Sequence, residues 1–162
     1  MTAIVLALTV AGITALGGGG STTSTSEATP DGPLVLFDGS AASFSDFEGQ
    51  PVVVNFWASW CPACVAELPE FQSAHEKYED EVTFLGIANT DRRTAAEALA
   101  AEVGLTYTLA DDPNGGLFRE LELIAMPSSV FINADGQIEE VFGGQLNEEA
   151  LAVRLEKLLN AS

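Results

Sequence analysis

From residue 34 onward, the apolar and polar positions alternate between patterns typical of strands and patterns typical of helices. They predict strands at residues 34–37, 52–57, 82–88, 106–110, 129–132 and 139–142. They predict helices at residues 62–78, 94–103 and 148–159, and a further short helix ahead of Met126. Residues 52–57 are apolar at nearly every position, which is typical of a central strand covered on both faces. This order of elements predicts an α/β fold.

The first 33 residues differ from the rest of the chain. Residues 3–16 are uncharged and mostly apolar, and a glycine run at 17–20 and a Ser/Thr-rich stretch follow them. The apolar run is shorter than the roughly 20 residues of a membrane-spanning helix and suits the core of a signal peptide. A buried N-terminal element is disfavoured, because such a linker packs poorly on a core. We expect residues 1–33 to be a signal peptide or membrane anchor plus linker, and residues 34–162 to form one domain outside the cytoplasm.

The charge of the chain excludes one class of partner. The formal net charge is -18, from 24 acidic residues against 6 Lys and Arg. Such a surface repels phosphate backbones, so nucleic acid is not an expected partner. A bland solvated surface, a saline habitat and a basic client protein all remain compatible with this charge. A monomer is the expected state.

The two cysteines, Cys61 and Cys64, form a C-x-x-C motif where a predicted buried strand meets a predicted helix. The first turn of a helix presents unpaired N–H groups and the positive end of the helix dipole, which lower the pKa of a thiol there. We therefore expect Cys61 to be the nucleophile. Cys64 lies one turn further on and is placed to resolve a mixed disulfide at Cys61. Two incidental buried cysteines are the alternative.

Metal binding is a weaker interpretation of the same residues. One cysteine pair and the single His75 cannot supply the four ligands of a structural zinc site. No metal and no cofactor are expected, and His75 is expected to be solvated. A Cu(I) chaperone remains an alternative, because soft thiolates bind Cu(I).

Residues 52–71 resemble the thioredoxin superfamily, and more closely its exported TlpA/ResA-like thiol-disulfide reductases, which carry an AhpC/TSA-Redoxin-like thioredoxin domain. The resemblance includes Asn55-Phe56-Trp57 before the cysteine motif and Glu67-Leu68-Pro69 after it. It implies a thioredoxin-like α/β fold, with a central mixed β-sheet and helices on both faces. The two helices and two strands predicted between Cys64 and Pro127 resemble the central insertion of the TlpA-like group.

The resemblance also implies roles for individual residues. Glu67 is implied as the proton acceptor of the cysteine pair, although its spacing alone would favour a solvated helix carboxylate. Asn55 stands where cytoplasmic thioredoxins have a titrating Asp. The Met126–Pro127 bond is implied to be cis, with Met126 and Pro127 contacting the client peptide. Trp60 would form an apolar rim beside Cys61.

These residues indicate an exported reductase. It would pass electrons from a membrane donor to disulfides in client proteins such as apocytochrome c, by exchange at Cys61 and Cys64. A disulfide-forming oxidant would use the same two sulfurs, so the direction of transfer stays open. A peroxiredoxin is disfavoured, because Cys61 is not preceded by the Pro and Thr of a peroxide site.

Overall fold

The structure is a computed structural model that describes residues 29–30 and 32–161. The predicted signal or anchor, and most of the linker, lie outside the described residues. The strands are β1 (Leu34–Leu36), β2 (Ala41–Ala42), β3 (Val52–Trp57), β4 (Thr83–Asn89), β5 (Thr108–Asp112), β6 (Ser128–Ile132) and β7 (Ile138–Gly143). The helices are the 3₁₀ helix η1 (Phe44–Phe47) and the α-helices α1 (Pro62–Tyr78), α2 (Arg93–Val103), α3 (Gly116–Glu120) and α4 (Glu148–Leu159).

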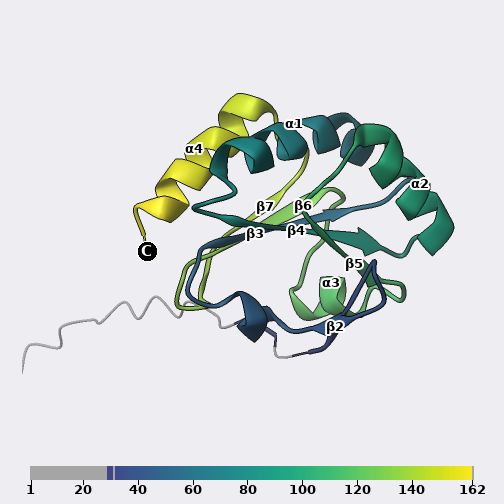
Figure 1. Cartoon of the computed structure of the whole chain (residues 1–162), viewed down its shortest axis with the longest axis horizontal. Coiled ribbons are helices and arrows are strands. Elements are labelled where there is room, and N and C mark those ends of the chain that lie inside the picture. The colour runs from purple at the N-terminus through teal and green to yellow at the C-terminus, as the bar shows by residue number, and fades with distance from the viewer. Residues whose placement is uncertain (1–28, 31, 162) are drawn as a thin grey trace, which may run out of the picture.

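The strands form one mixed sheet in the order β2-β1-β5-β4-β3-β6-β7 (Figure 1). β3 pairs in parallel with β4 and antiparallel with β6. All six residues of β3 are buried, as its continuous apolar run predicts. Trp57, its last residue, has no exposed surface and belongs to the core. The sheet therefore places the strand that leads to the cysteines at its centre.

Helices cover both faces of the sheet (Figure 1). On one face, residues of α1 and α4 pack on the sheet around Phe71, Phe84 and Leu155, and α2 packs beside α1. On the other face, η1 and α3 contribute Phe44 and Phe118 to a second cluster. This arrangement confirms the thioredoxin-like α/β fold, with α2, β4, β5 and α3 lying between the cysteines and Pro127.

Two expectations need correction. β5 begins at Thr108 rather than at residue 106, because Thr106 is engaged by the side chain of Gln72 before strand pairing starts. His75 is not simply solvated: its ring packs edge-on against Phe84 and Tyr107. Nε2 of His75 lies 3.7 Å from Glu79 Oε2.

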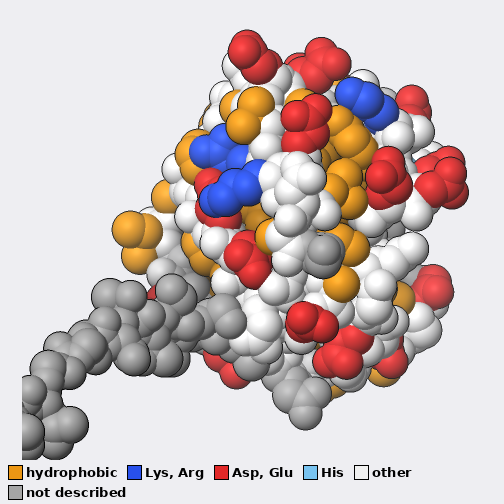
Figure 2. All heavy atoms as spheres, turned by 90° about the vertical axis from the view of Figure 1, so that its left-hand side faces the viewer, with side chains coloured by type: hydrophobic (Ala, Val, Ile, Leu, Met, Phe, Trp, Pro, Cys, Tyr) orange, Lys and Arg blue, Asp and Glu red, His pale blue; other side chains and the backbone are white. Residues whose placement is uncertain are grey.

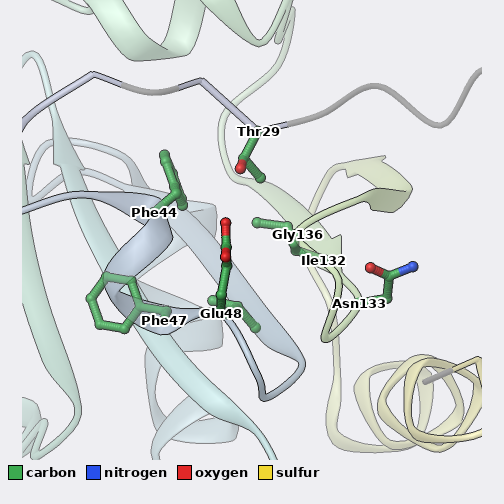
Figure 3. A pocket seen from close by; sticks show the side chains of 8 residues that line it. Thr29, Phe44, Phe47, Glu48, Ile132, Asn133 and Gly136 are labelled. Carbon is green, nitrogen blue, oxygen red and sulfur yellow. The ribbon is translucent and has the colours of Figure 1, made fainter.

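The described N-terminal end of the chain lies at the end of the sheet opposite the cysteines. The Thr29 N–H donates to the Gly136 carbonyl in the turn between β6 and β7, and Figure 3 shows both residues lining one pocket. Val52, the first residue of β3, pairs with Ile132 beside this turn, whereas β3 ends near Cys61. Among the residues that the structure describes, no helix is long and apolar enough to cross a membrane.

Among the described glycines, Gly86 in β4 has the closest neighbours to an added Cβ. An added Cβ would lie 2.8 Å from Leu109 Cδ2 and 2.9 Å from Tyr107 Cε2. We expect Gly86→Ala to lower the free energy of unfolding by about 1–3 kcal/mol, as overpacking does in cores. Urea unfolding of the oxidised protein measures this loss. Gly32→Ala is the control, because a Cβ there meets nothing within 4 Å, and equal stability of the two variants would contradict the prediction.

Candidate active site

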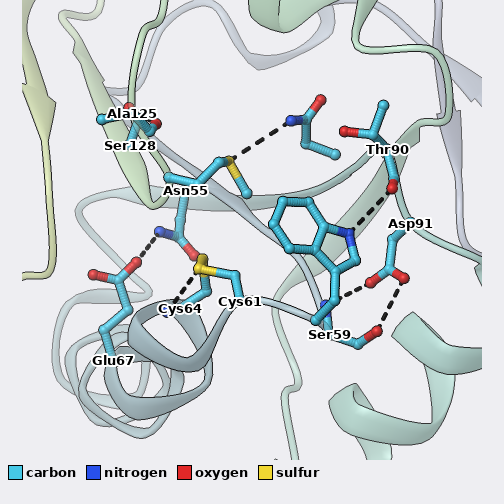
Figure 4. The surroundings of a disulfide bond; sticks show 12 residues. Asn55, Ser59, Cys61, Cys64, Glu67, Thr90, Asp91, Ala125 and Ser128 are labelled. Carbon is cyan, nitrogen blue, oxygen red and sulfur yellow. Dashed lines mark hydrogen bonds between the residues drawn. A yellow bond between two sulfur atoms is a disulfide. The ribbon is translucent and has the colours of Figure 1, made fainter.

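Cys61 and Cys64 form a disulfide at the start of α1, with their Cα atoms 5.2 Å apart (Figure 4). Cys61 is the N-cap of the helix, and its Sγ accepts the backbone N–H of Cys64 at 3.2 Å. Pro62 occupies the first helical position, where a missing N–H costs no hydrogen bond. The helix start therefore places an N–H donor on the outer sulfur, which stabilises negative charge there once the disulfide is reduced.

The two cysteines differ in their access to solvent. Cys64 has no exposed surface, and Cys61 is 6% exposed. A sulfur atom of another molecule can therefore approach Cys61 but not Cys64. The difference fits the sequence expectation of an outer nucleophile and an inner resolving thiol.

Glu67 lies one turn after Cys64 on α1 and is fully buried. Its Oε1 accepts from Asn55 Nδ2 at 2.7 Å, and its Oε2 accepts from the backbone N–H of Leu146 at 2.9 Å. Burial raises the pKa of Glu67 to about 7, and the hydrogen bonds from Leu146 and Asn55 oppose that rise. The solvated carboxylate that spacing alone favours is thus excluded.

Asn55 is the side-chain donor to this carboxyl. Its amide lies between Glu67 and the sulfur atoms in Figure 4, and the residue is 1% exposed. Its Oδ1 is buried and has no hydrogen-bond partner within the described part of the chain. A disulfide offers no hydrogen to this acceptor, whereas a thiol does.

The loop before β6 lies against the same cysteines. The Met126–Pro127 peptide bond is cis, which confirms the expectation from sequence. Met126 packs against the apolar cluster that contains Cys61 and Cys64. The Pro127 carbonyl accepts the N–H of Gly144, which ties the loop to the end of β7.

Sequence analysis singled out none of the residues at the end of β4 and directly after it, yet three of them contact the site. Asp91 accepts both the N–H of Ser59 at 2.5 Å and its hydroxyl at 2.9 Å. The Thr90 carbonyl accepts Trp60 Nε1 at 3.2 Å, and Asn89 Nδ2 lies 3.7 Å from the Met126 sulfur (Figure 4). One signal could have found them: parallel strands end at the same edge of a sheet, so the loops after β3 and β4 meet.

The comparison with known families matches residues 22–158 to Redoxin, most of the chain. The chain belongs to the Redoxin family. It is 33% identical over 124 residues to the thiol-disulfide oxidoreductase ResA of Oceanobacillus iheyensis, a match that covers 76% of this chain and 62% of the relative. The chain thus spans less than two thirds of that relative's length.

Solved structures with this fold include two secreted proteins. A secreted Mycobacterium tuberculosis disulfide oxidoreductase, homologous to E. coli DsbE, superposes with a TM-score of 0.73 at 25% identity, covering 79% of this chain and 96% of that one. A secreted thiol-disulfide isomerase from Corynebacterium glutamicum gives a TM-score of 0.74 at 25% identity, covering 82% of this chain and 85% of that one.

The site of this Redoxin-family chain can carry out thiol-disulfide exchange. It holds an accessible sulfur at a helix start, a second sulfur bonded to it, and a carboxyl group that titrates near neutral pH. Across the described ranges, no group of three or more His, Cys, Asp or Glu side chains could hold a metal ion.

Glu67 makes the stability of the oxidised protein depend on pH. Folding raises the pKa of Glu67 from 4.5 to about 7, so between these values the folded state keeps a proton that the unfolded state releases. The stability associated with the neutral carboxyl is complete below pH 4.5 and is lost as the pH rises through about 7. Over this range we expect the free energy of unfolding to fall by roughly 3 kcal/mol relative to Glu67→Gln.

Urea unfolding of the oxidised proteins at a series of pH values measures this difference. Glu149→Gln, at an exposed carboxyl at the start of α4, is the matched control and should follow the wild-type pH dependence. Parallel curves for the wild type and Glu67→Gln would show that Glu67 is not a buried titrating group.

Proposed function

We propose that this protein is a thiol-disulfide reductase that acts outside the cytoplasm on disulfides of client proteins such as apocytochrome c. The observation that carries the proposal is the Cys61–Cys64 disulfide at the start of α1, with the buried Glu67 carboxyl one turn below it. A membrane donor would return electrons to the pair. The names of its Redoxin-family relatives support exchange chemistry at these sulfurs.

In the proposed reaction, the Cys61 thiolate attacks a client disulfide and forms a mixed disulfide, and the first client thiolate leaves. Glu67 takes the proton of Cys64, and the Cys64 thiolate then attacks the Cys61 sulfur. The Cys61–Cys64 bond forms and the second client thiolate leaves. Two electrons have passed from the cysteine pair to the client, and a dithiol donor restores the pair.

The position of Glu67 supports reduction rather than oxidation. Proteins that strongly oxidise thiols have a high reduction potential because their reduced form is stabilised. In that form the nucleophilic cysteine is a thiolate of very low pKa. A carboxylate one helical turn from Cys64 repels a thiolate there and so opposes that stabilisation. The ionised form of Glu67 therefore favours a more reducing pair.

We propose that Trp60, Met126 and Pro127 contact the client. Trp60 is 57% exposed directly before Cys61. The peptide N–H and carbonyl of Met126 make no hydrogen bond to another described residue, so they are open to an extended client strand. The buried cis Pro127 holds this segment beside the sulfurs.

One observation supports action outside the cytoplasm. Two proteins that share the fold are described as secreted.

The reduction potential of the Cys61–Cys64 pair tests the direction of transfer. Equilibration of the protein with dithiothreitol or glutathione buffers should give a value near about -270 mV, the range of thioredoxin. Glu67→Gln removes the carboxylate and should have a higher potential than the wild type. A wild-type value near about -120 mV would overturn the reductase and make the protein an oxidant.

Trapping of clients tests the roles of the two sulfurs. Cys64→Ser keeps the nucleophile but cannot release the client, so it should accumulate mixed disulfides through Cys61. Cys61→Ser should form none and should lose turnover. Non-reducing electrophoresis and mass spectrometry identify the adducts. Adducts that form equally with both variants would contradict the assignment of nucleophile and resolving thiol.

A further inference from the structure

Both oxygens of the Glu67 carboxyl face N–H donors. Oε1 accepts from Asn55 Nδ2 at 2.7 Å, and Oε2 accepts from the Leu146 N–H at 2.9 Å. This arrangement suits an ionised carboxylate, which only accepts hydrogen bonds. A neutral carboxyl has an O–H that needs an acceptor, and the fully buried Glu67 cannot turn that O–H to bulk water.

The two donors differ in how they can respond when Glu67 is neutral. The Leu146 N–H belongs to the backbone and can only donate. The side chain of Asn55 is an amide, with a donor on one side and an acceptor on the other. A half-turn about its last side-chain bond exchanges Nδ2 and Oδ1 and leaves the rest of the residue in place. Oδ1 of Asn55 then accepts the O–H of Glu67.

The other side of the amide permits this half-turn. Oδ1 of Asn55 is buried and has no hydrogen-bond partner within the described part of the chain, so no bond is broken there. The amide lies between Glu67 and the sulfur atoms in Figure 4. Cys64 is one helical turn before Glu67 and on the same side of α1. After the half-turn, Nδ2 faces the sulfur side, where a thiolate can accept its N–H.

We propose that Asn55 is a reversible amide switch that couples the proton on Glu67 to the charge on Cys64. While Glu67 is ionised, Nδ2 of Asn55 binds the carboxylate and Oδ1 accepts the thiol hydrogen of Cys64. Once the proton has moved from Cys64 Sγ to Glu67 Oε1, the amide turns. Oδ1 then accepts the Glu67 O–H, and Nδ2 donates to the Cys64 thiolate. The total charge is unchanged, and each orientation fits one location of the proton.

The inference deepens the proposed function, because it rests on Glu67 taking the proton of Cys64 and adds the residue that couples the two. Asn55 is therefore a positioning residue that acts through Glu67. The switch holds the Cys64 thiolate at the moment when this thiolate attacks the Cys61 sulfur. It concerns the resolving step alone and is independent of which client is reduced.

The charged groups around Glu67 leave this coupling intact. In the described part of the chain, burial and the two hydrogen bonds shift the pKa of Glu67. Burial and the Glu67 charge raise the pKa of Tyr107, so this neighbour stays neutral. Glu148 and Glu149, at the start of α4, are exposed. Further carboxylates lie on the surface, as Figure 2 shows, where salt screens them.

NMR of the oxidised full chain tests the half-turn directly. The Glu67 carboxyl carbon and the Asn55 side-chain amide are followed across the pKa of about 7, with salt added to screen the surface charges. We expect the Asn55 amide protons to lie near Glu67 at high pH and near the Cys64 β-protons at low pH, with the midpoint of the Glu67 titration. In Glu67→Gln, the Asn55 signals should not change with pH.

Asn89 is the control within the same spectra. It is also a buried amide with an unpartnered Oδ1, but its Nδ2 faces the Met126 sulfur rather than a carboxyl. Its signals should not follow the Glu67 titration. Asn55 protons that stay beside Glu67 while the carboxyl titrates would overturn the switch. This measurement uses the wild type and so does not depend on how well a variant folds.

Stopped-flow kinetics tests the consequence for exchange. The reduced protein is mixed with dithiodipyridine, which releases one coloured thione when Cys61 attacks and a second when Cys64 resolves the adduct. We expect Asn55→Leu to slow the second release about tenfold and to leave the first within twofold, since a hydrogen bond to a charged sulfur is lost. Ser129→Ala is the matched control: Ser129 lies opposite Asn55 in β6, is fully buried and has an unpartnered Oγ.

The two releases separate this inference from the proposed function. Equal slowing of both releases in Asn55→Leu, or the same slowing in Ser129→Ala, would show a general structural effect and overturn the switch. A wild type that never gives the second release would instead overturn the resolving role of Cys64 and with it the proposed exchange reaction. A slow second release in Asn55→Leu alone supports the switch.

Discussion

The Glu67 carboxyl joins three segments that are far apart in the sequence. It sits on α1 and accepts one hydrogen bond from Asn55 in β3 and another from the Leu146 N–H ahead of α4. The buried charge is tolerated only because both oxygens are satisfied, and burial still holds the pKa near 7. The same contacts that fix α1 on the sheet therefore give the cysteine pair a neighbour that titrates at neutral pH.

The outer half of the site depends on a different set of contacts. Because β3 and β4 are parallel, the chain leaves both strands at one edge of the sheet. Three consecutive residues, the last of β4 and the two that follow it, each contact one part of the site. Asn89 contacts Met126, Thr90 accepts the indole N–H of Trp60, and Asp91 accepts from the Ser59 backbone and hydroxyl. The loop that carries Cys61 and the loop that carries Met126 are thus positioned by one short segment.

Much of the fold could be predicted from sequence, because local patterns decide it. β3, α1 and α4 have the bounds that their apolar patterns predict. The short elements were harder: η1 and β2 were not predicted, since a few residues carry too little periodicity. β5 was placed two residues early, because Thr106 looks β-prone but is bound by a side chain of α1. Element boundaries of this kind depend on neighbours, not on propensity.

The sequence by itself determined the strand, the helix start and the two cysteines at their junction, since these depend on residues adjacent in the chain. Tertiary structure alone decided the surroundings of that junction. Spacing along α1 would leave Glu67 in solvent, yet β3 and the segment before α4 close over it. Asp91 looks like an ordinary loop residue until the sheet brings it to Ser59. The reason is that burial and hydrogen bonds between distant segments set the pKa of Glu67 and the position of the loop at Ser59. No local sequence pattern indicates which distant segments will meet.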